Sequence, residues 1–296
     1  MYQTELFESP SIVGDRAVVN VASVPQRSPF RYAGGKTWLI PCIREWLNAR
    51  GGKGKELIEP FAGGGIVSLT AACENLVDRI TMVEKDEGVA AVWQVILNGE
   101  AEWLADEIVS FQLTPESARA AIARADESLE CRAFATIIKN RVNRGGILAD
   151  GASFIKNGEN GKGITSRWYP ETLKRRILDI AQVRHKIKFI EGDAFEVCAQ
   201  NAERKDVVYF IDPPYVKAGG RLYRYSAIDH EALFVLASRL QGNFLMTYDN
   251  DDEVQELANR HGFDIDLIAM KNTHHAKKTE LLIGQDLGWL KIRSPC

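Results

Sequence analysis

Paired cysteines and long apolar runs are both missing from this 296-residue chain, and each absence excludes a class of protein. The five cysteines are scattered, odd in number and without a CxxC pair. This pattern argues against a disulfide framework or a zinc site and is typical of a reducing cytoplasm. No apolar run approaches the roughly 18–20 residues that span a bilayer. The acidic N-terminus, MYQTELFESP, lacks the apolar core of a secretion signal. We therefore expect a cytoplasmic protein that does not bind a membrane.

A large excess of positive charge is also missing, since the net charge is −3. The distribution of charge is more informative than the total. Residues 139–188 hold twelve Lys and Arg but four Asp and Glu, so this segment carries +8 and the rest of the chain −11. Such asymmetry predicts a surface for a polyanion. Part of the segment, Lys174-Arg175-Arg176, also fits a solvated helix face.

The tetrapeptide Asp212-Pro213-Pro214-Tyr215 is the most informative motif that is present. It follows the apolar run 207–211, which predicts a strand buried on both faces. An acid at the exit of such a strand lies where open α/β sheets bind their ligands. Because proline has no N–H to donate, the Asp212 side chain and the Pro213 carbonyl can both accept hydrogen bonds from one small donor. With the ring of Tyr215 beside them, these acceptors suit a flat heterocycle that bears an amino group. The alternative is a strand end followed by a rigid turn.

A glycine cluster at 61–65 lies between a predicted strand, 57–58, and a predicted helix, 66–74. Glycine at such a turn lets the backbone approach a ligand without Cβ clashes. Glu84 follows Gly65 by nineteen residues, at the end of the next predicted strand, and an acid at this interval holds ribose hydroxyls. The arrangement serves either NAD or S-adenosylmethionine. The NAD interpretation is the weaker one, because Ser68 occupies the last glycine position of a GxGxxG loop.

A second glycine cluster, 32–37, ends in Gly-Lys-Thr as a phosphate-binding Walker loop does. That loop needs a glycine five positions before Gly35, where this chain has Phe30. The mismatch argues against hydrolysis of a nucleoside triphosphate.

The order of predicted elements indicates a Rossmann-like α/β domain that is interrupted once. Strands and helices alternate over 28–94 and again over 186–296, which we assign to one domain. Residues 95–185 are mainly helical, with a glycine-rich loop between 143 and 163, and predict an inserted domain. We treat residues 1–27 as an arm of unknown structure.

Taken together, these motifs resemble the Dam-like DNA adenine N6-methyltransferases, and the resemblance spans 29–284. It rests on Arg31-Tyr32-Ala33-Gly34-Gly35-Lys36, on Glu59-Pro60-Phe61-Ala62-Gly63-Gly64-Gly65, and on the tetrapeptide at 212–215, in the order that this family shows. Residues 140–146, Asn-Arg-Val-Asn-Arg-Gly-Gly, resemble a segment of the family's DNA-recognition domain, and the match fades after Gly146.

The resemblance implies an S-adenosylmethionine-dependent methyltransferase sheet with an inserted, mainly helical target-recognition domain. It implies a catalytic role for Asp212, Pro213, Pro214 and Tyr215. Its expected cofactor-binding residues are Tyr32, Ala33, Gly34, Lys36, Pro60, Phe61, Gly63, Gly65, Glu84, Asp193 and Asp212. Its expected DNA-binding residues, chosen from the basic segment, are Lys139, Asn140, Arg141, Asn143, Arg144, Lys162 and Arg167.

The expected reaction moves a methyl group from S-adenosylmethionine to N6 of an adenine that is flipped out of double-stranded DNA. The acceptors at 212 and 213 would hold the amine in line with the methyl group, so that alignment and electrostatics supply the catalysis. We expect a monomer without a metal site, because the stretch 274–278, His-His-Ala-Lys-Lys, has no third ligand at a suitable spacing. The basic loop 217–224 is predicted to cover the flipped base.

Three other functions remain open at this point. The same tetrapeptide also serves cytosine N4 methylation. A NAD-dependent oxidoreductase would use the same βαβ unit but leave residues 212–215 unexplained, and a non-enzymatic DNA-binding module would leave both glycine clusters unexplained. The sequence indicates neither the recognised DNA site nor whether a partner nuclease exists.

Overall fold

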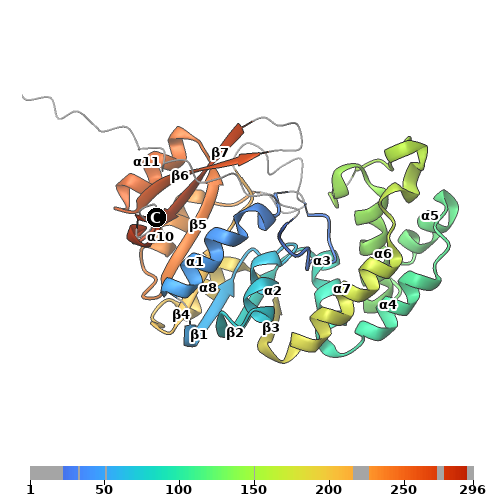
Figure 1. Ribbon diagram of the computed structural model, residues 1–296, viewed down its shortest axis with the longest axis horizontal. Coiled ribbons are helices and arrows are strands. Elements are labelled where there is room, and N and C mark those ends of the chain that lie inside the picture. The colour runs from blue at the N-terminus through green and yellow to red at the C-terminus, as the bar shows by residue number, and fades with distance from the viewer. Residues whose placement is uncertain are drawn as a thin grey trace, which may run out of the picture.

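The computed structural model describes residues 23–32, 34–50, 52–149, 151–215, 227–271 and 277–291. Its centre is a seven-stranded sheet with the strand order β3-β2-β1-β4-β5-β7-β6 (Figure 1). The strands are β1 (Gly52–Glu59), β2 (Val77–Glu84), β3 (Ile187–Glu191), β4 (Val207–Ile211), β5 (Asn243–Asp249), β6 (Asp264–Lys271) and β7 (Lys277–Gly284). Neighbouring strands from β3 to β5 pair in parallel, whereas β7 is antiparallel to both β5 and β6. The predicted Rossmann-like α/β class is thereby confirmed.

Helices cover both faces of this sheet. The α-helices of the described residues, of which α4 to α7 lie beside the sheet, are α1 (Ile40–Arg50), α2 (Ile66–Cys73), α3 (Glu87–Asn98), α4 (Ala101–Ser110), α5 (Pro115–Ala123), α6 (Leu129–Val142), α7 (Pro170–Val183), α8 (Ala194–Asn201), α10 (His230–Ala237) and α11 (Asp252–Arg260). Side chains alternate between the two faces along β4, as in any strand. Val208 and Phe210 pack with the helices α1 to α3, while Tyr209 and Ile211 pack with α8, α10 and α11. Every residue of β4 is buried, as the apolar run predicts.

The strand order reverses between β1 and β4, which lie next to each other. From β1 the chain proceeds outward through β2 to β3, and it then returns to β4 and continues on the other side through β5. The connections that follow β1 and β4 therefore leave the sheet in different directions. A crevice at such a switch point is where open α/β sheets bind ligands.

The insertion lies between β2 and β3. Figure 1 shows its helices α4 to α7 grouped on one side of the sheet, with α3 between the sheet and these helices. Thr114 caps α5 by accepting a hydrogen bond from the Ser117 backbone, and Pro115 occupies the first turn. The predicted boundary at 94–95 falls inside α3, and the division into two domains stays a prediction. No helix among the described residues has the length and apolar character that a bilayer crossing requires.

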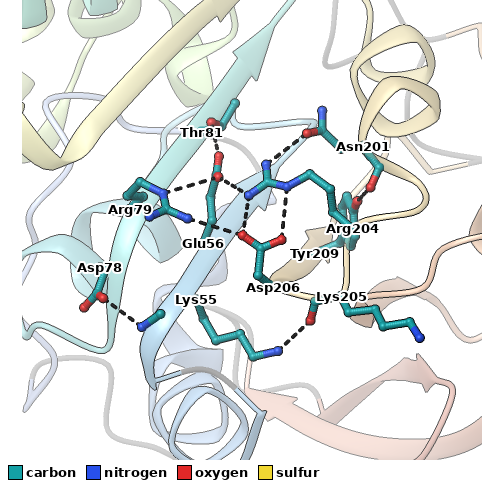
Figure 2. Close-up of polar contacts among 11 residues, drawn as sticks. Lys55, Glu56, Asp78, Arg79, Thr81, Asn201, Arg204, Lys205, Asp206 and Tyr209 are labelled. Atoms are coloured by element: carbon teal, nitrogen blue, oxygen red, sulfur yellow. Dashed lines mark hydrogen bonds and ion pairs between the residues drawn. The ribbon is translucent and has the colours of Figure 1, made fainter.

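At the amino end of β4, a network of ion pairs joins β1, β2 and the segment before β4 (Figure 2). Arg204 donates to Glu56 Oε2 at 2.9 Å and to Asp206 Oδ2 at 2.6 Å. Arg79 Nη2 reaches the same Asp206 carboxylate at 3.3 Å, and Thr81 donates to Glu56 Oε1 at 2.6 Å. The two carboxylates and two guanidinium groups therefore neutralise one another across β1, β2 and the segment before β4.

Candidate active site

A cavity of about 1000 Å³ opens at the opposite, carboxyl end of the central strands. The last residue of β1, Glu59, the last residue of β2, Glu84, and the residue that follows β4, Asp212, all line it. The crevice predicted by the strand order is therefore present. It brings together both glycine clusters and the tetrapeptide, which are far apart in the sequence.

The glycine cluster after β1 packs so closely that side chains would not fit. A Cβ on Gly63 would lie 2.6 Å from the Tyr32 ring, and one on Gly65 would lie 2.6 Å from Met82 Cε. Both glycines also have positive φ, 47° and 63°. Trp93 of α3 fixes the turn by donating from Nε1 to the Gly63 carbonyl at 3.0 Å. The turn thus needs glycine both for its backbone and for contact with Tyr32.

The Glu84 carboxyl also fixes this glycine turn by accepting backbone hydrogen bonds. Its Oε2 accepts from the Gly63 backbone N–H at 2.8 Å, and its Oε1 accepts from Lys85 and Asp86 at 2.9 and 2.8 Å. Burial raises the pKa of Glu84 to about 7, although the three backbone donors act to lower it. The acid at the end of β2 is therefore a positioned acceptor that still lines the cavity.

Asp193 lies after β3 and caps α8. Its Oδ1 accepts from the Phe195 backbone at 2.8 Å, while Lys85 Nζ lies 2.9 Å from Oδ2. Burial opposes ionisation of Asp193, but the hydrogen bond from Lys85 and the backbone donors outweigh it and lower its pKa. The carboxylate reaches the cavity beside Phe195.

Two groups from other segments fix the Asp212 carboxylate. Thr247 of β5 donates to Oδ1 at 2.7 Å, and Lys36 Nζ lies 2.9 Å from Oδ2. Lys36 is 2% exposed and also donates to the Gly34 carbonyl at 2.8 Å. Since each carboxylate oxygen has two acceptor sites, the described residues leave one on each oxygen for a ligand.

Glu280 of β7 is a second carboxyl beside Lys36, at 3.7 Å from Nζ. Tyr215 donates to its Oε2 at 3.0 Å. Burial raises the pKa of Glu280, with the charge of Lys36 acting against it. Burial alone would lower the pKa of Lys36, but the charges of Asp212 and Glu280 outweigh it and raise that pKa. Lys36 therefore keeps its proton inside the protein.

The Tyr215 ring is held by its neighbours. It stacks on Tyr248 with 5.9 Å between ring centroids, and Lys36 Nζ lies 4.9 Å from its centroid. Of the tetrapeptide, Asp212 and Pro214 line the cavity, whereas Pro213 and Tyr215 are not among the residues that line it. Stacking of Tyr215 on a base stays a prediction.

The described residues that were predicted to bind the cofactor all line this one cavity. They are Tyr32, Gly34, Lys36, Pro60, Phe61, Gly63, Gly65, Glu84, Asp193 and Asp212. Ala33, the loop 217–224 and the stretch 274–276 lie outside the described residues. The role of each residue in cofactor binding stays a prediction, but their convergence is an observation.

The predicted DNA-binding residues do not form a single exposed surface. Asn140 is fully buried and hydrogen-bonds the backbone of Arg31 and Gly146. Asn143 is also buried and donates to the Ile147 carbonyl at 2.8 Å. Both asparagines therefore hold the protein's own backbone, and their contact with DNA stays a prediction.

The basic members of that prediction are placed differently. Arg144 and Lys162 are exposed, Lys139 is half-buried, and Arg141 and Arg167 line the cavity. For these five residues DNA contact stays a prediction.

Sequence reasoning assigned no role to several site residues. Glu59 is buried and accepts from the Ser68 backbone at 2.9 Å, and burial raises its pKa to about 8. Thr247 and Glu280 hold Asp212 and Lys36 from the last strands of the sheet. Each of these residues is a polar residue inside or at the end of an apolar strand, which is the one local sign of a functional position. That sign does not indicate which side chain or backbone group the residue contacts.

Among the described residues no group of three or more His, Cys, Asp or Glu side chains could hold a metal ion. The cavity therefore offers carboxylates as separate acceptors on different strands. An amine, hydroxyl or ammonium group fits such acceptors.

The family model for D12 class N6 adenine-specific DNA methyltransferases matches residues 32–81, which include Tyr32, Lys36 and the glycine cluster at 61–65. No curated protein matches the chain. Similar solved structures include a putative RNA methyltransferase, PH1948, from Pyrococcus horikoshii, with 12% identity, 86% of this chain and 84% of that chain covered, and a TM-score of 0.39. A precorrin-6y C5,15-methyltransferase from Geobacter metallireducens GS-15 has 12% identity, coverage of 86% and 91%, and a TM-score of 0.37. The rRNA methyltransferase aviRa from Streptomyces viridochromogenes has 13% identity, coverage of 87% of each chain, and a TM-score of 0.34. The family match, together with the Rossmann-like sheet, supports a methyltransferase whose cofactor is S-adenosylmethionine.

Proposed function

We propose that the protein transfers a methyl group from S-adenosylmethionine to the exocyclic N6 amine of adenine in double-stranded DNA. The observation that carries the proposal is the Asp212 carboxylate. It lies at the exit of the central buried strand, is fixed by Thr247 and Lys36, and lines the same cavity as the glycine cluster. A methyl acceptor bound at Asp212 and a methyl donor bound at the glycine cluster would share one enclosed space.

The residues of the cavity fit the cofactor by their chemistry. The carboxyls of Glu84 and Asp193 accept hydrogen bonds, as ribose hydroxyls and an adenine amine require, and the rings of Phe61 and Phe195 line the same space. The sulfonium cofactor supplies an activated methyl group when it is bound. The chain positions the cofactor and the methyl acceptor, and it excludes water from them.

The chain's part in the reaction is to hold the acceptor amine. Its lone pair is delocalised into the adenine ring, so the free amine is a weak nucleophile. Hydrogen bonds from the amine to Asp212 and to the Pro213 carbonyl would favour a pyramidal nitrogen with a more available lone pair. Because Lys36 and Thr247 already fix the carboxylate, little reorganisation is needed when the base arrives.

Two observations favour DNA as the source of the adenine. The matched family model describes adenine-specific DNA methyltransferases. The basic segment 139–188 also belongs to the insertion that flanks the cavity. An amine inside a duplex is out of reach, so the base must leave the stack, at a cost of a few kcal/mol.

Methylation of unmethylated genomic DNA tests this proposal. The protein is incubated with that DNA and S-adenosylmethionine, and modified bases are mapped by sequencing. We expect N6-methyladenine within one short sequence context, and no modification with Asp212→Ala as the matched control. N4-methylcytosine instead would overturn the assignment to adenine, and methylation of RNA but not DNA would overturn the assignment to DNA.

A further inference from the structure

Four arginines line the same cavity on the side of the insertion. Arg31 lies in the segment before Lys36, and Arg141 lies in the last turn of α6. Arg167 ends the short 3-10 helix Gly163–Arg167, and Arg176 lies on α7. They come from four segments of the chain and meet at one place. Four of the acids that line the cavity, Glu59, Glu84, Asp193 and Asp212, lie instead at or just after the ends of strands.

Three of these arginines have no carboxylate partner among the residues that the structure describes. Arg141 is 4% exposed, and its Nη2 donates to the Pro29 carbonyl. Arg176 Nη1 donates to the Ser28 carbonyl at 3.1 Å. Within the described ranges, no ion pair joins Arg31, Arg141 or Arg176 to an acid. Arg141 Nε and Arg31 Nη1 are buried without an acceptor.

The remaining charges around these groups are positive. Burial lowers the pKa of Arg141 to about 9, and the charges of Arg176, Arg31 and Arg167 lower it further. Burial and the charge of Arg167 lower the pKa of Arg31 in the same way. Uncompensated buried cations are costly, and an anion that binds among them relieves both the desolvation and the repulsion.

We infer that Arg31, Arg141, Arg167 and Arg176 form a binding site for a phosphate of the DNA backbone next to the target base. This inference rests on the proposed function and deepens it. Guanidinium groups suit phosphate because their planar fork donates two parallel hydrogen bonds to its oxygens. One donor in this cluster, Arg141 Nε, already lacks an acceptor.

The cofactor's carboxylate is the other source of an anion in this cavity. It carries a single negative charge, as one backbone phosphate does, so a lone carboxylate would leave most of the cluster uncompensated. A DNA strand that delivers a base to Asp212 brings one phosphate on each side of that base. Two of the arginines, Arg141 and Arg176, also belong to the helices of the insertion, where the basic segment lies. The cluster therefore fits the nucleic acid better than the cofactor.

The test uses Arg31→Gln and Arg176→Gln, which remove charge while keeping a polar side chain. Arg141 is not the first choice, because it is almost fully buried, whereas Arg176 is half-buried. Arg239→Gln is the matched control, since Arg239 is exposed and is not among the described residues that line the cavity. Thermal unfolding of each variant confirms that it is folded.

DNA affinity is measured against salt, and S-adenosylmethionine affinity by calorimetry without DNA. For each cluster variant we expect DNA binding roughly ten- to a hundredfold weaker and the slope of log K against log salt smaller by about one. Cofactor affinity should stay within about twofold, and Arg239→Gln should match the wild type. Loss of cofactor affinity with DNA affinity intact would instead assign the cluster to the cofactor's carboxylate and overturn the inference.

A second measurement separates this inference from the proposed function. Inorganic phosphate should raise the unfolding temperature of the wild type more than that of Arg31→Gln or Arg176→Gln, whether or not DNA is the substrate. If the wild type binds no DNA but phosphate stabilises it through the cluster, the proposed function fails and the anion site remains. If the wild type binds DNA and both variants bind it equally well, the inference fails and the proposed function remains.

Discussion

The charged side chains at the two ends of the central sheet are paired to different degrees. At the amino end of β4, Glu56 and Asp206 are paired with Arg79 and Arg204, partly in contact with solvent (Figure 2). At the carboxyl end, Lys36 is the described cation beside two carboxyls, Asp212 and Glu280, and all three are largely or fully buried. Both ends use the same residue types. At the amino end the carboxylates are paired with arginines of the protein itself. At the carboxyl end they keep hydrogen-bond acceptor sites that a ligand can use.

Asp212→Ala is expected to have the largest effect of any single change at the carboxyl end. Loss of the fixed acceptor should reduce methyl transfer by at least roughly a thousandfold, in line with the loss of one preorganised electrostatic group. The variant should remain folded. Single-turnover transfer of labelled methyl groups to DNA measures the effect, and circular dichroism controls for folding. Ordinary turnover in this variant would remove Asp212 from the mechanism.

Lys36→Met should have the next largest effect, because it leaves Asp212 and Glu280 buried without their cation. The expected loss is about 3–5 kcal/mol in the free energy of unfolding. The double variant Lys36→Met/Glu280→Gln should regain part of that loss, since one uncompensated charge is then gone. Urea unfolding of the two single variants and the double variant gives the coupling energy. A coupling near zero would mean that the two buried groups act independently.

Glu59→Gln tests the pH dependence of a third buried acid at the carboxyl end. The pKa of Glu59 is raised from its ordinary value to about 8 in the folded protein. The folded state therefore holds this proton more tightly, so the stability that it contributes is full at low pH and is lost as pH rises toward 8. Between pH 5 and pH 8 the wild type should lose on the order of 3 kcal/mol more than the variant. Equal slopes in urea unfolding across this range would contradict the raised pKa.

Glu56→Gln should have the smallest effect, because the amino-end network is partly exposed. We expect a loss of about 1 kcal/mol in the free energy of unfolding and no change in the rate of methyl transfer. Glu231→Gln, in an exposed pair with Arg260, is the matched control and should cost less than about 0.5 kcal/mol. A clear loss of transfer rate in Glu56→Gln would show that the two ends of the sheet are coupled.

Much of the fold could be predicted because its signals are local. The apolar run at 207–211 is β4, and the helix predicted at 66–74 is α2. Thr114 and Asp229, residue types that favour helix starts, both accept hydrogen bonds from the first turn of a helix. Caps and apolar runs depend on neighbours in the sequence, so a single chain reveals them.

The features that the sequence did not reveal depend on distant partners. Nothing local indicates that β7 inserts between β5 and β6, because that order is decided by which strands pair. Asn140 was expected at DNA because it lies in a basic segment, but its surroundings are set by the backbone of Arg31, which lies 109 residues earlier. Sequence spacing located the glycine turn and Asp212, while the partners of Asp212 came from β5 and from the segment before α1.

Asn140 does more than fill space between α6 and the segment at Arg31. Its side-chain oxygen accepts from the Arg31 N–H at 2.8 Å, and its side-chain nitrogen donates to the Arg31 carbonyl at 3.1 Å. One amide thereby joins the backbone next to Tyr32 to the insertion, and a tilt of α6 would act on the wall of the cavity through this link. If partner binding on the insertion tightens the cofactor's hold, linkage requires the cofactor to tighten the partner's hold by the same factor. Heterotropic cooperativity would then pass through two side chains of α6, since Arg141 also bonds the Pro29 carbonyl.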